Sequence, residues 1–140
     1  MKRAILAFLA GLVTWLLVVS VFDRGLRIAL AGYAAAEPKM IFTIGMMAAR
    51  LTIAAVTSVI AGAVVGWISP MGVRVAWVMG AILLAVFLPE HVRLWNAFPL
   101  WYHLTFLVTL VPLVVLGSWL TRTRTSGGPA ADGLGGQPAL

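Results

Sequence analysis

The chain has 140 residues, of which 62% are hydrophobic and only 10% are charged. A soluble domain of this length has too little interior to bury so much apolar surface, so the composition excludes an ordinary water-soluble fold. The absence of Cys excludes disulfides, thiolate metal sites and lipid attachment at Cys. The formal net charge of +6 is typical of the basic flanks of membrane helices, and nucleic acid is not an expected partner.

The first predicted membrane span is Ala4–Phe22. These 19 residues would cover about 28 Å as a helix, and the run is longer than the apolar core of a cleavable signal peptide, about 7–15 residues. We therefore expect a retained span. Asp23 and Arg27 follow at a spacing that allows pairing if the helix continues. The segment Gly25–Ala36 suits a short interfacial helix or a bent extension of the first span.

The second predicted span is Met40–Ile68, which follows a helix start at Glu37-Pro38-Lys39. As one helix it would be about 43 Å long, so it must tilt or protrude from an apolar layer of about 30 Å. Arg50 is the charge inside this stretch. It can extend to the membrane boundary, bind an anionic headgroup, or pair with a carboxylate. We expect it to face protein and to pair with Glu90 or Asp23.

The third and fourth predicted spans are Val73–Leu88, ended by Pro89, and Leu100–Leu120, which contains Pro112. The predicted fold class is all-α: an integral membrane four-helix bundle with short loops. The transmembrane domain covers residues 1–121, with spans at about 4–22, 40–68, 73–88 and 100–120. Residues 122–140 are rich in Gly, Pro and polar side chains and are predicted to form a disordered tail.

Small residues recur at every fourth position of the second span. Such a row lets helix backbones approach closely in lipid, where association depends on close packing. The sequence predicts a packed face here, and contact within the chain is favoured over a dimer interface. The four residues are Ala54, Ser58, Gly62 and Gly66.

Polar and ionisable side chains gather around the loop between the third and fourth spans. Two His and one Glu lack a third strong ligand at a fixed helical spacing, so no metal site is predicted. Anchoring of the aromatic and His side chains in the membrane interface is favoured instead. The candidate polar cluster consists of Arg50, Asp23, Glu90, His91, Tyr102 and His103.

The predicted spans contain neither Asp nor Glu. Proton- or cation-coupled transport usually needs an ionisable acid within the membrane. Small multidrug exporters have this size and helix number but use a carboxylate in their first span, so a drug antiporter is disfavoured. Known catalytic and phosphate-binding motifs are missing from the sequence as well. We therefore predict a protein that is not an enzyme and has no cofactor.

Three segments resemble those of small, uncharacterised four-helix bacterial membrane proteins, and the resemblance covers most of the chain except the tail. It implies a bacterial inner membrane and carries no activity to any residue. The segments are Ala36-Glu37-Pro38-Lys39-Met40, Met46-Met47-Ala48-Ala49-Arg50-Leu51 and Phe98-Pro99-Leu100-Trp101-Tyr102-His103-Leu104.

Two functional hypotheses remain. The favoured one is an accessory or scaffold protein that packs against other membrane helices or lipid, with the bilayer, other membrane proteins or further copies of itself as partners. The alternative is a small channel or transporter whose path opens at the face formed by Arg50, Glu90 and His103. A water-filled passage from the loop side past Arg50 would separate the two. Lys and Arg divide evenly between the two sides, and the acids on the loop side favour cytoplasmic termini.

Overall fold

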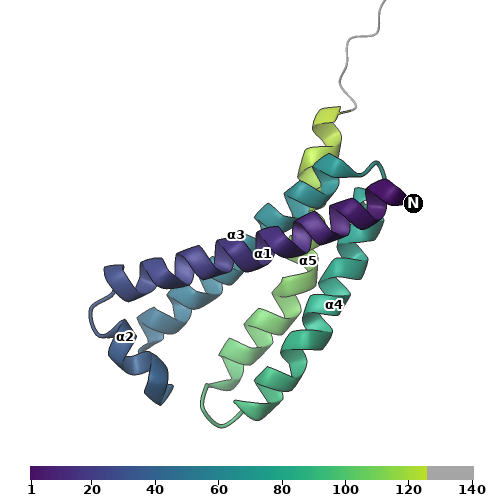
Figure 1. Ribbon diagram of the computed structural model, residues 1–140. Helices are drawn as coiled ribbons and strands as arrows, with labels where there is room; N and C mark the ends of the chain where they lie inside the picture. The colour runs from purple at the N-terminus through teal and green to yellow at the C-terminus, as the bar shows by residue number, and fades with distance from the viewer. Residues whose placement is uncertain (126–140) are drawn as a thin grey trace, which may run out of the picture.

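The computed structural model describes residues 1–125 and is all-α in this part of the chain (Figure 1). Four of its helices are long and apolar enough to cross a membrane, and the chain is a multi-pass membrane protein on this basis. The helical elements in chain order are α1 (Lys2–Ala29), α2 (Tyr33–Ala36), the 3-10 turn η1 (Glu37–Lys39), α3 (Ile44–Ile68), α4 (Gly72–Arg93) and α5 (Leu100–Thr125).

The first two long helices differ from the predicted spans at one end each. Helix α1 continues through the polar residues after Phe22, and its Arg27 lies 3.4 Å from Asp23 one turn earlier. Helix α3 begins at Ile44 rather than Met40. Met40 has a positive φ of 53°, which interrupts the helix, and the Thr43 side chain then caps the new one by accepting from the Met46 N–H.

The last two helices correct two expectations. Pro89 does not end the third span, because α4 continues to Arg93. A single proline removes only one backbone donor from the helix. The turn after it still closes, since the Leu94 N–H donates to the Glu90 carbonyl at 3.0 Å. Helix α5 runs to Thr125, so residues 122–125 of the predicted tail are helical. The rest of that tail, residues 126–140, lies outside the described residues.

The helices are packed closely at one end of the bundle and diverge towards the other. Figure 1 shows α1 and α3 separating from α4 and α5 towards the loop that joins α4 to α5. We call this the loop end. The opposite end, where α1 begins, the α3–α4 turn lies and α5 ends, is called the terminal end.

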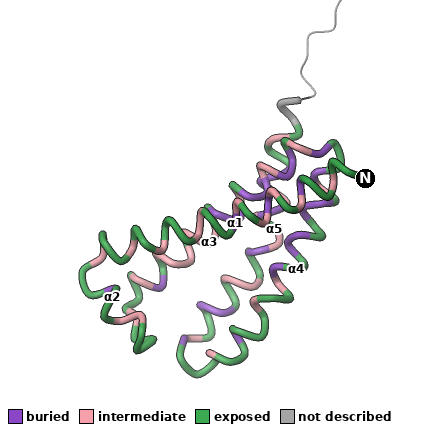
Figure 2. The backbone as a smooth tube through the Cα atoms, in the orientation of Figure 1, coloured by how far each residue is buried: buried purple, intermediate pink, exposed green. Residues whose placement is uncertain are grey.

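Glycine holds the terminal half of the bundle together. Gly62 and Gly66 on α3 lie directly against the α5 backbone at Val114 and Ser118, while Gly117 on α5 lies against Val59 of α3. A side chain at any of these positions would collide with backbone atoms, so the helices approach as closely as small residues permit. Buried positions are dense along this contact in Figure 2.

The predicted small-residue row therefore packs inside the chain. Ser58, Gly62 and Gly66 are buried, and Ala54 is half-buried. Small residues on α1 and α4 do the same: Gly11 contacts Val65 and Met79, and Ala76 is fully buried. The apolar core that results consists of Ala7, Trp15, Ala61, Val65, Val75, Ala76, Met79, Leu83, Leu110 and Val114.

Candidate functional site

Arg50 is the centre of a polar network at the loop end. Its Nη1 donates to the Tyr33 hydroxyl at 2.7 Å, and its Nε reaches the Tyr102 hydroxyl at 3.4 Å. The guanidinium carbon lies 4.9 Å from the centre of the Phe42 ring, which adds a cation–π contact. Arg50, which belongs to α3, is thus held by side chains from α2 and α5 and from the segment before α3.

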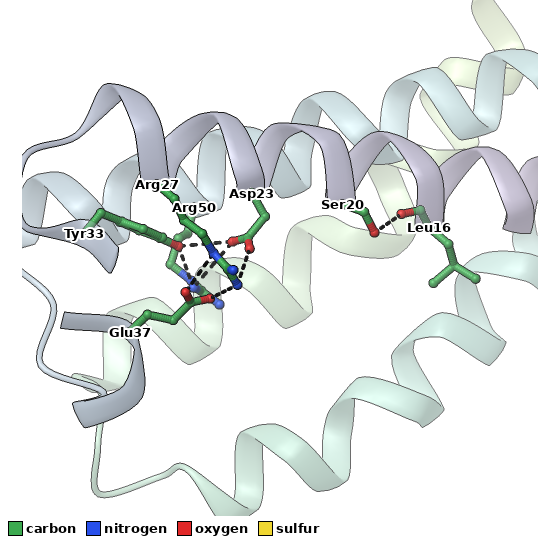
Figure 3. A network of polar contacts seen from close by, with 7 residues as sticks. All are labelled: Leu16, Ser20, Asp23, Arg27, Tyr33, Glu37 and Arg50. Atoms are coloured by element: carbon green, nitrogen blue, oxygen red, sulfur yellow. Dashed lines mark hydrogen bonds and ion pairs between the residues drawn. The ribbon is translucent and has the colours of Figure 1, made fainter. Parts of the chain in front are cut away.

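Asp23 is the carboxylate nearest to Arg50 in this network (Figure 3). Its Oδ1 lies 3.9 Å from Arg50 Nη1 and accepts a hydrogen bond from the Tyr33 hydroxyl at 3.2 Å. Tyr33 therefore bridges the two charges, accepting from Arg50 and donating to Asp23. Burial raises the pKa of the Tyr33 phenol above its ordinary value of 10.0, so the hydroxyl keeps its proton at neutral pH.

A second ion pair fastens the first loop to α1. Arg27 contacts the Glu37 carboxylate through Nη2 and Nε, each at 2.9 Å, in the two-pronged geometry that suits guanidinium and carboxylate. Arg27 also reaches Asp23 at 3.4 Å. Because Glu37 starts η1, these contacts hold α2 and Tyr33 in position above Arg50.

His91 on α4 and His103 on α5 form a buried pair, with their Nδ1 atoms 2.7 Å apart. One ring donates and the other accepts. Two nitrogen ligands of a tetrahedral metal ion would lie about 3.3 Å apart, so this shorter contact is a hydrogen bond. The part of the chain that the structure describes contains no cluster of three metal-ligating side chains.

The expectation that these histidines anchor the protein in the membrane interface is wrong. Their exposed fractions are 9% for His91 and 1% for His103, and each ring faces the other helix. Trp95 stacks on the His103 ring with centroids 5.0 Å apart and covers it. The divergence of the helices leaves an interior that these rings fill. Within residues 1–125, the Nε2 atom of His103 has no hydrogen-bond partner.

Two adjoining cavities occupy the space between the diverging helices. The first, about 170 Å³, is lined by Glu90, His91 and His103 among others. The second, about 120 Å³, is lined by Asp23 and Trp15 among others. We call the two cavities together the loop-end recess. The side chains that line both of them, and so stand between them, are Arg50, Phe87, Tyr102 and Phe106.

The recess ends at a packed floor. Trp15 Nε1 donates to Ser58 Oγ at 3.2 Å, and the Ser58 hydroxyl donates to the Ala54 carbonyl at 2.7 Å. The Trp15 ring also packs on Phe87, with centroids 5.1 Å apart. Below this level a space of only about 10 Å³ lies beside Ser58, before the buried core begins. The Trp15–Ser58 contact and the buried core thus lie between Arg50 and the terminal end.

All members of the predicted polar cluster lie around this recess. Glu90 is the least engaged: its side chain is 57% exposed and lies 4.0 Å from Arg93 on the same helix. Of the two carboxylates expected for Arg50, Asp23 is the one in contact. Since Asp23 belongs to α1 and Glu90 to α4, two of the spanning helices do carry acids, at their loop ends.

Sequence reasoning missed two contributors. Tyr33 is fully buried and joins Arg50 to Asp23, and Phe42 lies under the guanidinium. The available signal for Tyr33 was its phenol in an otherwise Ala-, Gly- and Leu-rich segment, where an aromatic hydroxyl has no local partner. For Phe42, the sequence offered no signal beyond its position before α3.

Comparison with protein-family models, with curated proteins and with solved structures finds no match to this chain. The geometry of the loop-end recess is therefore the basis for the functional inference.

Proposed function

We propose that this chain is a non-enzymatic accessory or scaffold protein of the bacterial inner membrane, which packs against lipid or other membrane helices and uses the loop-end recess as its recognition site. The observation that supports this most is the floor of the recess. Trp15, bonded to Ser58 at 3.2 Å and packed on Phe87, closes it above a solid core. A recess that is closed at its base suits binding.

The outer faces of the helices support the packing part of the proposal. Large apolar side chains remain exposed along the whole length of α1, from Ile5 and Leu9 to Leu17 and Val21. Lipid tails or neighbouring membrane helices are the surroundings in which such a surface is stable. The network of Arg50, Tyr33 and Asp23 lies at the loop end, which is where a specific partner would be recognised.

The alternative is a small channel or transporter with its path at Arg50, Glu90 and His103. The recess gives such a path an opening on the loop side. Asp23 is the carboxylate that the first helix would offer to such a path, but Arg27 and Arg50 already engage it at 3.4 and 3.9 Å. A carboxylate already paired within the chain is poorly suited to binding a transported cation.

We also propose that both termini lie in the cytoplasm. At the loop end, carboxylates offset much of the positive charge. Arg27 pairs with Glu37, Arg50 with Asp23, and Arg93 with Glu90. The basic side chains at the terminal end include Lys2 and Arg3, as is typical of cytoplasmic flanks.

The test combines transport and contact measurements on the full chain. In proteoliposomes, we expect ion and proton flux equal to that of empty vesicles. In cells, a photo-crosslinking amino acid at Leu94, which lines the recess, should capture a membrane protein or lipid that the same probe at the outward-facing Trp77 does not. Arg50→Gln should weaken this capture.

Arg93→Gln is the matched control, because it removes the same charge from the loop end at a side chain that is 78% exposed. It should leave the capture unchanged. Flux above that of empty vesicles, lost in Arg50→Gln but kept in Arg93→Gln, would contradict the proposal and establish the transport alternative.

A further inference from the structure

The larger cavity of the loop-end recess has the size of an aromatic ring and aromatic walls. It encloses about 170 Å³, and an engineered apolar cavity of about 150 Å³ in another protein binds benzene. Phe98 and Tyr102 are stacked in its wall with centroids 4.9 Å apart. Flat walls favour a flat ligand, because rings attract one another at centroid distances of about 4.5–7 Å. The Phe and Tyr side chains that line the cavity are Phe87, Phe98, Tyr102 and Phe106.

Two hydrogen-bonding side chains of this cavity have unused nitrogen atoms. Arg50 donates through Nη1 and Nε, and its Nη2 makes no hydrogen bond within residues 1–125. His103 is 1% exposed, and its Nε2 is buried without a partner in the same part of the chain. Both side chains line the cavity. A buried nitrogen without a partner costs free energy, so a ligand that bonds to it gains affinity.

The histidine pair determines what His103 can offer to a ligand. A neutral imidazole carries one N–H, and the Nδ1 atoms of His91 and His103 are 2.7 Å apart, so one ring donates and the other accepts. When His103 is the acceptor, its own proton is on Nε2, which is then a hydrogen-bond donor. A carbonyl oxygen accepts from such a donor and from the Arg50 guanidinium. The cavity therefore suits a ring that carries carbonyl groups.

The charges around the recess favour a neutral ligand over an anion. The positive charge of Arg50 is met by Asp23 at 3.9 Å. Glu90 lines the larger cavity and Asp23 the adjoining one, so an anion would meet a carboxylate in either cavity. Repulsion between like charges disfavours that arrangement, whereas a neutral carbonyl compound avoids it.

The depth of the site favours a ligand from the bilayer. At about 1.5 Å per residue, Arg50 lies about 9 Å from the start of α3 at Ile44. On the same basis, His103 lies about 4.5 Å from the start of α5 at Leu100. These positions are at the end of the spanning helices, where the apolar layer meets the headgroups. Rings that carry polar groups prefer this level of the membrane.

We propose that the larger cavity of the loop-end recess binds the ring of a membrane quinone. The ring lies among the aromatic side chains, its carbonyl oxygens accept hydrogen bonds from Arg50 and His103, and its hydrocarbon chain stays in the bilayer. This inference rests on the proposed function, because it names the class of lipid that the recess recognises.

The experiment measures quenching of tryptophan fluorescence in nanodiscs that contain the full chain. The probe is 2-decyl-1,4-benzoquinone, which quenches an indole on close approach, and Trp95 reports on the cavity because it stacks on His103. The chain has no Cys, so the quinone cannot react with a thiol. Quinone bound at a site gives quenching that saturates, whereas quinone dispersed in the lipid gives quenching that rises in proportion to its concentration. We expect saturation.

Decylbenzene is the matched control ligand, since it has the same ring and chain without the carbonyl groups. At least about tenfold more decylbenzene than unlabelled quinone should be needed to displace the probe, which is the factor for one hydrogen bond from a charged group.

Two pairs of variants test the contacts. Arg50→Lys keeps the charge but loses the guanidinium, and should weaken the saturable quenching about tenfold. Arg93→Lys makes the same change at a side chain that is 78% exposed, and should have no effect. Leu94→Phe adds a ring at the cavity wall and should weaken binding, whereas Val92→Phe adds it at a position that is 64% exposed and should not.

Three results would each overturn the quinone site: quenching of the unmodified chain that never saturates, equal displacement by decylbenzene and quinone, or equal effects within both pairs of variants. The proposed function can fail or stand separately. Quenching that never saturates, together with capture of a membrane protein by the probe at Leu94, would exclude the quinone and leave the recess as a recognition site for protein.

Discussion

The two ends of this bundle are held together by different kinds of contact. At the terminal end, glycines such as Gly62 and Gly117 bring the backbones of α3 and α5 into direct contact. At the loop end the helices diverge, and polar and aromatic side chains such as Arg50 and Tyr102 bridge the space. Direct backbone contact leaves no volume between α3 and α5 at Gly62 and Gly117, whereas bridging side chains at the loop end leave cavities of about 170 and 120 Å³ between the helices.

The charges divide in the same way. Loop-end cations meet carboxylates within the chain, as Arg27 does with Glu37 at 2.9 Å. Among residues 1–125 the acids Asp23, Glu37 and Glu90 all lie at the loop end, whereas the terminal end carries basic residues such as Lys2, Arg3 and Arg74. The loop end is therefore organised by ion pairs within the chain, and the described residues of the terminal end have a positive formal charge.

The strongest test of the packing difference is Gly62→Leu. A Cβ at this position would overlap the Val114 carbonyl, and that backbone cannot move without separating α3 from α5. We expect the free energy of unfolding to fall by at least about 3 kcal/mol. This is at or above the upper end of the usual range for overpacking, because backbone atoms rather than a side chain would have to move. Thermal unfolding in detergent measures it.

Gly25→Leu is the matched control. Gly25 lies near the loop end of α1 and has open space around its Cβ position, so the variant should melt at or slightly above the temperature of the unmodified protein. Equal destabilisation by the two substitutions would mean that the direct backbone contact is not what holds the terminal half together.

Arg50→Gln should have the next largest effect. The change leaves the buried Tyr33 hydroxyl without its donor and Asp23 with one cation fewer. Since 32% of the Arg50 side chain is exposed, the free energy of unfolding is expected to fall by about 1–2 kcal/mol, well below the loss for a fully buried pair. Denaturation in detergent provides the comparison, and Arg93→Gln should change stability by no more than about 0.5 kcal/mol.

The smallest effect is expected at the histidine pair. Replacing either His91 or His103 by Phe leaves the other ring nitrogen buried without a partner, whereas replacing both removes the need for one. The double variant should therefore be more stable than the sum of the single losses predicts, with a coupling of about 0.5–1.5 kcal/mol. A coupling near zero would mean that the 2.7 Å contact contributes nothing to holding α4 against α5.

Much of the bundle follows from the sequence for a simple reason. Long apolar runs such as Ala4–Phe22 must be helical in lipid, because every backbone polar group has to be satisfied within its own segment. The small-residue spacing on α3 likewise predicts that another helix packs closely against it, and Gly62 lies against the α5 backbone at Val114. The ends of the helices were harder to predict, because Pro89 and Asp23 discourage a helix locally and only the surrounding contacts allow it to continue.

What the sequence determined by itself was the class of structure and the presence of a charged, aromatic cluster on the loop side of the membrane. The tertiary structure decided how that cluster is arranged. His91 and His103 are 12 positions apart and lie on different helices, so no local pattern could predict that their rings would meet. Arg50 had two candidate carboxylates, and the angle between the helices brings Asp23, held through Tyr33, within reach. Glycine contacts bring the helices together at the opposite end, and the helices diverge from there towards the loop end, an arrangement that depends on several helices at once and that no single segment of the sequence contains.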